Sequence, residues 1–295
     1  MYLGIRISSM KKPVTAFLVF LAALAASAQS FYAVRKERSL IATGGIGTST
    51  YFGELANPGD YFDARPSISA GLQYYFTNRI SARAELSWFQ LKGDDAKADA
   101  EGRIKRNLSF VSNNFEFNAA GQINLLPKGR RFYQRPQINP YVFIGVGLLY
   151  FNPKAEYQGR KYALQPLRTE GVHYNRVTVA IPHGIGVRYM VDPFLNIGFE
   201  LGYRKIFTDY LDDVSTVYVD NTSFTDPIAA ALADRRPEIG LPVRPAGSIR
   251  GNPTKDDGYA LMQIKIEYYL PASFFSEQRK LYTKKRKYYY KKRRR

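Results

Sequence analysis

Eight segments of the chain alternate apolar residues with polar or small ones at a period of two. In residues 195–204, Ile197 and Phe199 lie on the apolar face, and Glu200 and Arg204 lie on the opposite one. Because side chains alternate across a strand, each such segment needs an apolar environment on one side and a polar one on the other. The pattern predicts strands at residues 40–52, 66–76, 80–91, 108–125, 140–151, 177–191, 195–208 and 259–270.

The connections between these strands alternate in length. Tight turns occur at 77–78 and 192–193, and the connection at 127–139 is moderate. The remaining connections are generally longer, and the seventh extends over 209–258. Outer-membrane barrels have short periplasmic turns and long outer loops. We therefore predict an all-β fold, an eight-stranded antiparallel up-and-down transmembrane β-barrel in the outer membrane of a Gram-negative bacterium, with both termini in the periplasm.

The N-terminal segment has the order of a secretory signal peptide. Lys11 and Lys12 precede an apolar run at 14–25, and small residues follow at 26–28. The run is shorter than the roughly 20 residues of a transmembrane helix, so export with cleavage is the better interpretation. We predict a signal peptide at 1–28, a barrel at 29–271 and a separate tail at 272–295.

Composition favours the barrel over a soluble β-sandwich, whose strands would also alternate apolar and polar residues. Aromatic residues make up 15% of the chain, with 23 Tyr and 19 Phe, and they suit the girdles at membrane interfaces. The chain has no cysteine, which excludes disulfides and thiolate chemistry.

The inward face of the predicted strands carries four acidic and four basic side chains. An eight-stranded interior is just filled by side chains, so we expect these charges to pair in a structural plug rather than to line a pore. A conduction or proton path is the functional alternative. The eight residues are Arg83, Glu85, Glu116, Arg188, Glu200, Arg204, Lys265 and Glu267.

Catalysis has little support in the sequence. Neither His173 nor His183 has a nucleophile or base partner at a recognisable spacing, and we expect no enzyme and no cofactor. His183 falls on the outward face beside Pro182, for which a local bulge is the expected explanation.

Three aspartates follow the seventh predicted strand. Asp209, Asp212 and Asp213 offer oxygen ligands to calcium, but their spacing is not that of an EF-hand loop. We expect no metal there and interpret the segment as a capped, solvated strand end. The same aspartates are our candidates for fixing the long last loop.

The tail is strongly basic. From residue 272 onward it has eleven Lys or Arg and one Glu, in a chain of net charge +18. Such blocks are usually disordered interaction arms, although a merely solvated tail is an alternative. Candidate partners are an acidic periplasmic protein, anionic lipid headgroups or cell-wall polymers, whereas export argues against nucleic acid. The tail bases are Arg279, Lys280, Lys284, Lys285, Arg286, Lys287, Lys291, Lys292, Arg293, Arg294 and Arg295.

Four segments carry a family resemblance. They are 51–55 (Tyr-Phe-Gly-Glu-Leu), 139–147 (Asn-Pro-Tyr-Val-Phe-Ile-Gly-Val-Gly), 181–189 (Ile-Pro-His-Gly-Ile-Gly-Val-Arg-Tyr) and 207–215 (Phe-Thr-Asp-Tyr-Leu-Asp-Asp-Val-Ser). Together they resemble the PorG-like outer-membrane barrels of Bacteroidota, which are associated with the type IX secretion system. The resemblance implies a barrel that docks periplasmic ring components, although many paralogues share the barrel without that role.

The predicted function is therefore non-enzymatic: an outer-membrane barrel, in contact with lipid, that binds periplasmic partners and helps anchor a protein secretion assembly. A surface-exposed structural or adhesive barrel acting through its long loops is the alternative. A lipid-modifying enzyme is a weaker third hypothesis.

Overall fold

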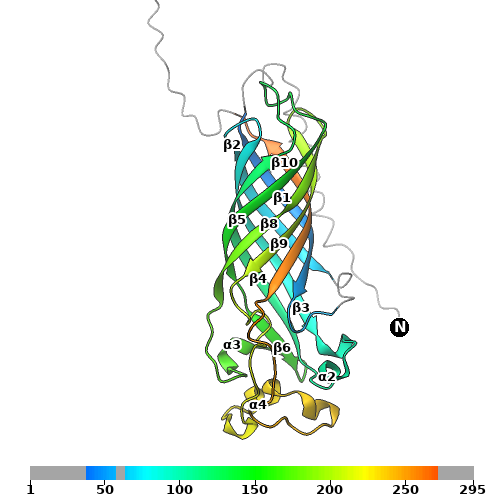
Figure 1. The fold of residues 1–295 in the computed structure, drawn as a ribbon, viewed down its shortest axis with the longest axis vertical. Helices are drawn as coiled ribbons and strands as arrows, with labels where there is room; N and C mark the ends of the chain where they lie inside the picture. Colours follow the sequence, from blue (N-terminus) through cyan, green and yellow to red (C-terminus); the bar gives the residue numbers. More distant parts are fainter. Residues whose placement is uncertain (1–37, 58–63, 272–295) are drawn as a thin grey trace, which may run out of the picture.

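The computed structural model describes residues 38–57 and 64–271, whose strands close into one antiparallel barrel (Figure 1). The hydrogen-bonded order is β3-β2-β1-β10-β9-β8-β5-β4, and pairing of β3 with β4 closes the ring. This confirms the predicted eight-stranded barrel, and the ends of each predicted strand lie within a few residues of the observed ends. The wall is built from β1 (Leu40–Phe52), β2 (Arg65–Tyr75), β3 (Ile80–Asp94), β4 (Ser109–Asn124), β5 (Ile138–Tyr150), β8 (Val177–Met190), β9 (Leu195–Ile206) and β10 (Gly258–Tyr269).

A hairpin in the fifth connection was not predicted. It consists of β6 (Pro153–Tyr157) and β7 (Arg160–Ala163), and β6 continues the sheet from the loop end of β4. Its residues are too few and too charged to show the alternation that marks the wall. The predicted signal peptide and the tail lie outside the described residues.

The long connections also contain short helices, which gather at one end of the barrel (Figure 1). No helix within residues 38–57 and 64–271 is both long enough and apolar enough to cross a membrane. The helices are η3 (Asp95–Lys97), α2 (Glu101–Ile104), α3 (Leu164–Leu167), η4 (Asn221–Ser223), α4 (Pro227–Ala233) and η5 (Arg236–Ile239).

The barrel has a short-turn end and a loop end, as the lengths of the connections predict. The connections 76–79, 125–137 and 191–194 lie at the short-turn end. Strand β1 begins there and β10 ends there, so residues 38 and 271 lie at that end as well. The loop end carries the longer connections with α2, α3, α4 and the β6–β7 hairpin (Figure 1).

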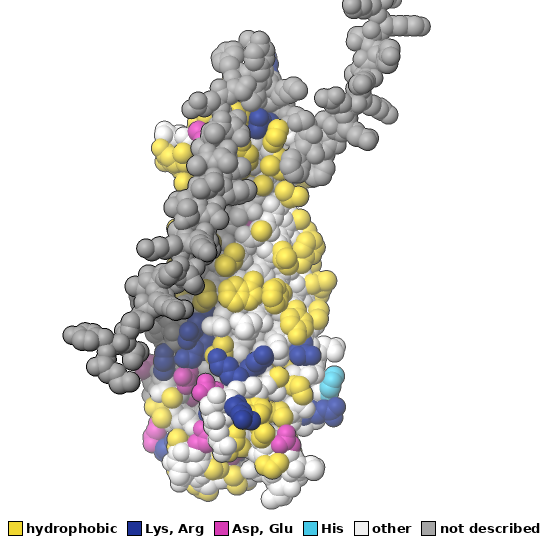
Figure 2. Space-filling view, turned by 180° about the vertical axis from the view of Figure 1, so that it is seen from behind, with side chains coloured by type: hydrophobic (Ala, Val, Ile, Leu, Met, Phe, Trp, Pro, Cys, Tyr) yellow, Lys and Arg dark blue, Asp and Glu magenta, His cyan; other side chains and the backbone are white. Residues whose placement is uncertain are grey.

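The outer wall is apolar along most of its height. Outward side chains such as Ile46 and Ile144 are 63% and 64% exposed, and Figure 2 shows hydrophobic side chains over the wall with Lys and Arg nearer the loop end. Aromatic side chains mark the two edges, with Tyr74 near the short turns and Tyr203 near the loops. A closed barrel pairs its backbone internally, and an apolar exterior suits lipid, so this wall has the form of a membrane-spanning barrel.

Pro182 does not produce the expected bulge. Hydrogen-bonded pairing between β5 and β8 lapses beside it, but Ile144 still faces His183 and Gly147 faces Ala180 in one register. A proline has no N–H to donate, so the ladder loses bonds without gaining a residue. The bulge prediction was therefore wrong.

Candidate functional site

The middle of the barrel is filled by charged side chains. All eight charged residues that the alternation places inside are buried. Four of them form one neutral quartet: Arg83, Glu85, Glu200 and Lys265. Arg83 donates two hydrogen bonds to Glu200, at 2.7 and 2.8 Å. Lys265 Nζ lies 2.7 Å from Glu85 and 3.8 Å from Glu200, so every charge in the quartet faces an opposite one.

The other four charges form two pairs along the same lumen. Arg188 Nε lies 2.6 Å from a Glu267 oxygen, and Arg204 Nε lies 3.6 Å from Glu116. Tyr259 donates its hydroxyl proton to Glu116. Buried charges are costly unless paired and hydrogen-bonded. Arg188 meets both conditions with Glu267. Arg204 is paired with Glu116 by charge and donates its hydrogen bond to the carbonyl oxygen of Gly202 at 2.6 Å.

Glycine on the inner face makes room for one of the large lumen side chains. A Cβ at Gly186 would overlap the ring of Tyr141. That ring cannot move aside easily, because the Arg188 guanidinium lies 3.7 Å from its centroid and its hydroxyl donates to Glu200 at 2.7 Å. The glycine-rich inner faces thus allow this interior to be filled.

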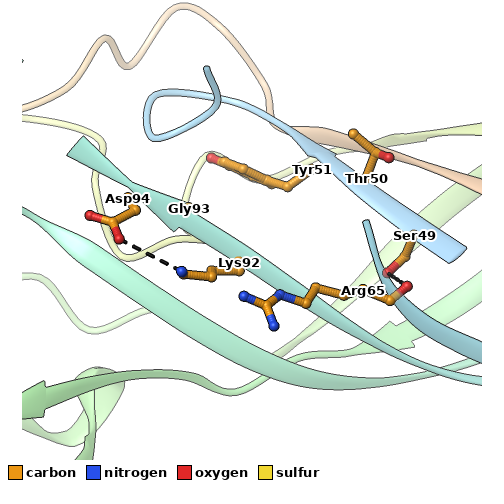
Figure 3. A pocket seen from close by; sticks show the side chains of 7 residues that line it. All are labelled: Ser49, Thr50, Tyr51, Arg65, Lys92, Gly93 and Asp94. Atoms are coloured by element: carbon orange, nitrogen blue, oxygen red, sulfur yellow. Dashed lines mark hydrogen bonds and ion pairs between the residues drawn. The ribbon is translucent and has the colours of Figure 1, made fainter. Parts of the chain in front are cut away.

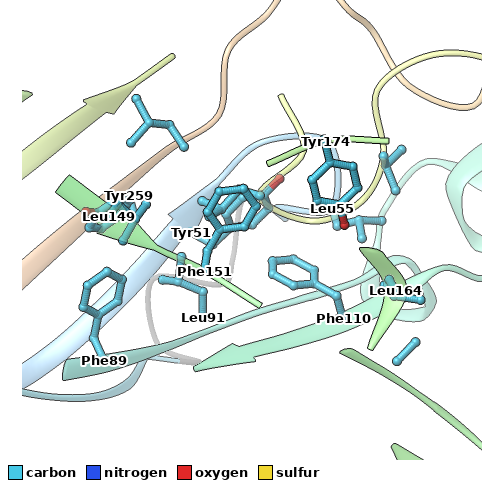
Figure 4. Close-up of a cluster of buried hydrophobic side chains, with 14 of the residues drawn as sticks. Tyr51, Leu55, Phe89, Leu91, Phe110, Leu149, Phe151, Leu164, Tyr174 and Tyr259 are labelled. Atoms are coloured by element: carbon cyan, nitrogen blue, oxygen red, sulfur yellow. The ribbon is translucent and has the colours of Figure 1, made fainter. Parts of the chain in front are cut away.

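Apolar layers close both ends of the charged lumen. At the short-turn end, Phe132 from the connection 125–137 is fully buried against Tyr75 and Tyr269. At the loop end, a larger cluster joins inward strand residues such as Phe89 to loop residues such as Leu164 (Figure 4). The interior is therefore a packed core with paired charges at its centre rather than an open channel.

The aspartates after β9 are not solvated, contrary to the sequence interpretation. Asp212 and Asp213 are almost fully buried, and Asp209 is 8% exposed. Asp213 accepts a hydrogen bond from Tyr174 at 2.7 Å. Arg250 donates to the Asp213 carbonyl oxygen, which ties together distant parts of the last loop. A solvated strand end was expected because sequence alternation gives no sign that the loops fold over the mouth of the barrel.

Glu170 extends this network into the fifth connection. It accepts from Arg250 at 2.8 Å and from the backbone N–H groups of Ser215 and Thr216 at 3.0 and 2.9 Å. Arg250 also donates to the carbonyl oxygen of Ala233 at the end of α4. The fifth and seventh connections thus form one ordered loop cap, defined here as residues 151–176 and 207–257.

An acidic triad lies at the base of this cap, beside the ends of the strands. The Tyr51 hydroxyl is 2.8 Å from an Asp212 oxygen and 2.7 Å from an Asp257 oxygen. Glu54 completes the group, with one oxygen from each of the three carboxylates lying within 4.8 Å of the others. Burial raises the pKa of Asp212, Asp257 and Glu54 above their ordinary values.

Sequence reasoning identified only one member of this triad. Asp212 stood among the three predicted aspartates, whereas Glu54 appeared only within the segment 51–55 and Asp257 was not considered. Their shared feature is a position just beyond a strand end, Glu54 after β1 and Asp257 before β10. Because β1 and β10 are neighbours, that feature could have predicted that Glu54 and Asp257 lie close together.

The profile of one protein family matches most of the chain. It is described as "Domain of unknown function (DUF6089)" and matches residues 16–225. The chain belongs to the DUF6089 family. The matched region contains both 51–55 and 207–215, which meet at the acidic triad of this DUF6089 barrel. The family description carries no function, and the finer PorG-like identity stays a prediction.

Several solved structures, among them the outer membrane protein OprG, are similar to this DUF6089 chain at low identity. Neisserial surface protein A (NspA) is 7% identical, covering 78% of this chain and 97% of its own, with a TM-score of 0.41. OprG from Pseudomonas aeruginosa is 10% identical, covering 80% and 98%, with a TM-score of 0.40. Ail of Yersinia pestis is 10% identical, covering 79% and 99%, with a TM-score of 0.39. No curated protein matches the chain.

The two histidines of the DUF6089 barrel lie apart. His173 is in the loop cap, with its Nε2 3.3 Å from the Gln165 amide nitrogen. His183 is exposed on the outer wall, with its ring against that of Tyr203. The tail bases Arg279 to Arg295 fall outside the described residues.

The loop-end rim carries further basic side chains beside two hollows. A small hollow between β1, β2 and β3 is lined by Arg65, Lys92 and Asp94, with Lys92 3.7 Å from Asp94 (Figure 3). A neighbouring hollow of about 350 Å³ adds Lys154 and Lys161. These bases lie on the loop side of the apolar wall, where lipid headgroups meet the barrel.

Proposed function

We propose that this DUF6089 barrel is a non-enzymatic outer-membrane anchor that binds periplasmic proteins and helps hold a protein secretion assembly, of the type IX kind. The observation that carries the proposal is the filled interior, with balanced charges between two apolar layers. A barrel filled in this way suits attachment to a membrane better than transport through it.

Contact with the periplasm would be made at the short-turn end. Short turns of outer-membrane barrels face the periplasm, and residue 271 lies at that end, so the basic tail begins there. The short turns themselves add exposed bases at Arg79, Arg130 and Arg131. Exposed bases at this end, where the described chain stops just before the basic tail, favour an acidic protein partner.

A pull-down from detergent-solubilised native membranes tests this proposal. The full chain is compared with a chain stopped after Pro271, and bound proteins are identified by mass spectrometry. We expect the full chain to recover periplasmic ring or lipoprotein components and the shortened chain to lose them. Recovery should fall steeply as salt is raised, because exposed charges are screened beyond about 8–10 Å at physiological ionic strength.

Two control outcomes separate the possible docking surfaces. If the shortened chain keeps the partners, a variant with Arg79, Arg130 and Arg131 changed to Gln should lose them, which would assign docking to the turns. Glu156→Gln, an exposed loop-end change, should not alter recovery in either background. No specific partner with any version would refute the secretion anchor.

A second candidate function is supported by the loop cap. Its core is held by the buried Arg250–Glu170 ion pair, while Ile249 is 82% exposed and Val243 is also exposed on its surface. An ordered loop surface with exposed apolar groups suits adhesion to another surface. Deleting the segment around α4 should then abolish surface attachment without changing recovery of periplasmic proteins.

The proposal includes the absence of catalysis. The placements of His173 and His183, one in the cap and one on the lipid-facing wall, give no shared site. Lipid composition of membranes carrying His173→Ala or His183→Ala should equal that of membranes carrying the unaltered chain. A change in lipid acylation with either variant would favour the enzyme hypothesis.

A further inference from the structure

We propose that Glu54, Asp212 and Asp257 bind one divalent cation, of the size and ligand preference of calcium, at the loop end of the barrel. Each carboxylate comes from a different stretch of chain: the turn after β1, the segment after β9, and the residue before β10. Because Asp212 lies near the start of the long seventh connection and Asp257 at its end, a shared cation would hold both ends of that loop against the first strand.

The geometry already gathers the ligands. One oxygen from each carboxylate lies within 4.8 Å of the other two. Asp212 and Asp257 are each only 1% exposed, and backbone N–H groups fix them: Val214 donates to Asp212 at 2.9 Å, and Leu211 donates to Asp257 at 3.0 Å. Carboxylates held this way cannot easily turn to solvent to separate their charges.

The triad is short of positive charge. The Tyr51 hydroxyl has a single proton but lies within hydrogen-bond distance of both Asp212 and Asp257. Arg106 is a basic side chain whose charge acts on Glu54 and Asp212, yet its guanidinium is bound to Asp95 at 2.6 and 2.9 Å. Three clustered carboxylates with so little compensation are costly in a buried place, and a cation would remove that cost.

Asp209 supplies an independent indication of a ligand. It is 8% exposed, and neither of its oxygens accepts a hydrogen bond of ordinary geometry, although the Ser215 side chain lies near it. Its charge acts on both Glu54 and Asp257, so it adds a further negative charge near the triad. Glu54 Oε2 is likewise buried without a donor. Such groups are rare in native proteins, and a bound ion is one of the explanations that they call for.

The donor set determines the class of ion. Carboxylate and phenol oxygens are hard ligands, and calcium accepts irregular arrangements of them more readily than magnesium does. Zinc and copper prefer nitrogen or sulfur, and neither histidine nor any cysteine is present in the triad. Glu54 also borders an open hollow of about 410 Å³ with Asn252, Lys255 and Asp256, which gives an ion a path from solvent.

Calorimetric titration of the EDTA-treated, full-length chain in detergent tests the site, with CaCl₂ as the ligand and MgCl₂ as the comparison. We expect one Ca²⁺ per chain, bound more tightly than Mg²⁺. Glu54→Gln and Asp257→Asn should each weaken Ca²⁺ binding on the order of tenfold or more, since affinity follows the number of charged ligands. Asp99→Asn removes an exposed carboxylate in the third connection and should bind as the unaltered chain does.

A second readout keeps the proposal testable if a variant folds poorly. Heat-modifiable gel mobility checks whether each variant forms a closed barrel. Glu54 is only half-buried, so we expect Glu54→Gln to form one. Ca²⁺ should protect the 207–257 connection from limited proteolysis in the unaltered chain and in Asp99→Asn, but not in Glu54→Gln.

Three results would overturn the proposal. The first is no Ca²⁺ uptake by the unaltered chain up to about 10 mM, which exceeds the range of weak extracellular sites. The second is unchanged binding in closed Glu54→Gln, and the third is Mg²⁺ binding as tightly as Ca²⁺.

Discussion

At the scale of residues, the barrel is specified by which charges share its interior. Strand parity was enough to predict the eight inward charges, because the side-chain period is two and one face must suit lipid. Their pairing could not be predicted in the same way, since Arg83 and Glu200 are 117 positions apart in the chain. The acidic triad lies beyond the strand ends, where parity no longer applies, so only Asp212 was identified.

Removing an ion pair from the quartet should cost less than the sum of removing its two charges singly. Arg83→Met leaves Glu200 and Glu85 with one cation between them, and we expect a loss of about 3–5 kcal/mol in unfolding free energy. Arg83→Met with Glu200→Met restores neutrality and should be less destabilised than the sum of the single changes. Urea unfolding in lipid vesicles gives both values, and additive losses would show that the pair is not coupled.

Gly186 should not tolerate a methyl group. Gly186→Ala drives a Cβ into the Tyr141 ring, which is held by Arg188 and Glu200, and overpacking of this kind costs about 1–3 kcal/mol. Gly121→Ala is the matched control, because its Cβ would meet nothing closer than a carbonyl oxygen at 3.9 Å. The same vesicle unfolding assay should separate the two, and equal stability would contradict the tight fit.

At the scale of elements, the strands of the wall could be predicted from the sequence, whereas the segments that close its two ends could not. A membrane strand must present an apolar side chain to lipid at every second residue, and that requirement leaves an alternating pattern over whole strands. The β6–β7 hairpin and α4 lie beyond the loop end of the wall, where no such requirement acts. The connection 125–137 was predicted as a moderate turn, and nothing in its sequence pattern indicated that Phe132 enters the barrel mouth.

Phe132 should be the main stabilising side chain of that connection. Phe132→Ala empties a fully buried site between Phe194 and Tyr269, and we expect a loss of about 3–5 kcal/mol. Arg130→Ala changes an exposed neighbour and should stay within about 0.5 kcal/mol of the unaltered chain. A small loss for Phe132→Ala would mean that the short-turn end is not closed by this ring.

At the scale of the whole molecule, the two ends differ in character. The short-turn end carries exposed bases and the start of the tail, while the loop end carries the ordered cap and the acidic triad. This polarity is what the anchor proposal requires, with one end for periplasmic contact and the other facing outward.

The orientation can be measured by cysteine labelling, because the chain has no cysteine of its own. Ile249→Cys places a thiol on the exposed loop cap, and Arg130→Cys places one on a short turn. A membrane-impermeant maleimide should label Ile249→Cys on intact cells and Arg130→Cys only after the outer membrane is opened. The reverse labelling pattern would show that the barrel has the opposite orientation, with residue 271 and the start of the tail at the cell surface.

The most direct test of the filled interior is single-channel recording of the full-length chain in planar bilayers, with a porin prepared in parallel as a positive control. Charges paired between two apolar layers should give no discrete conductance steps in the chain or in Asp99→Asn. Stable channel openings that change with Glu200→Gln would contradict the account, since they would show ions passing through the quartet and assign the barrel to transport.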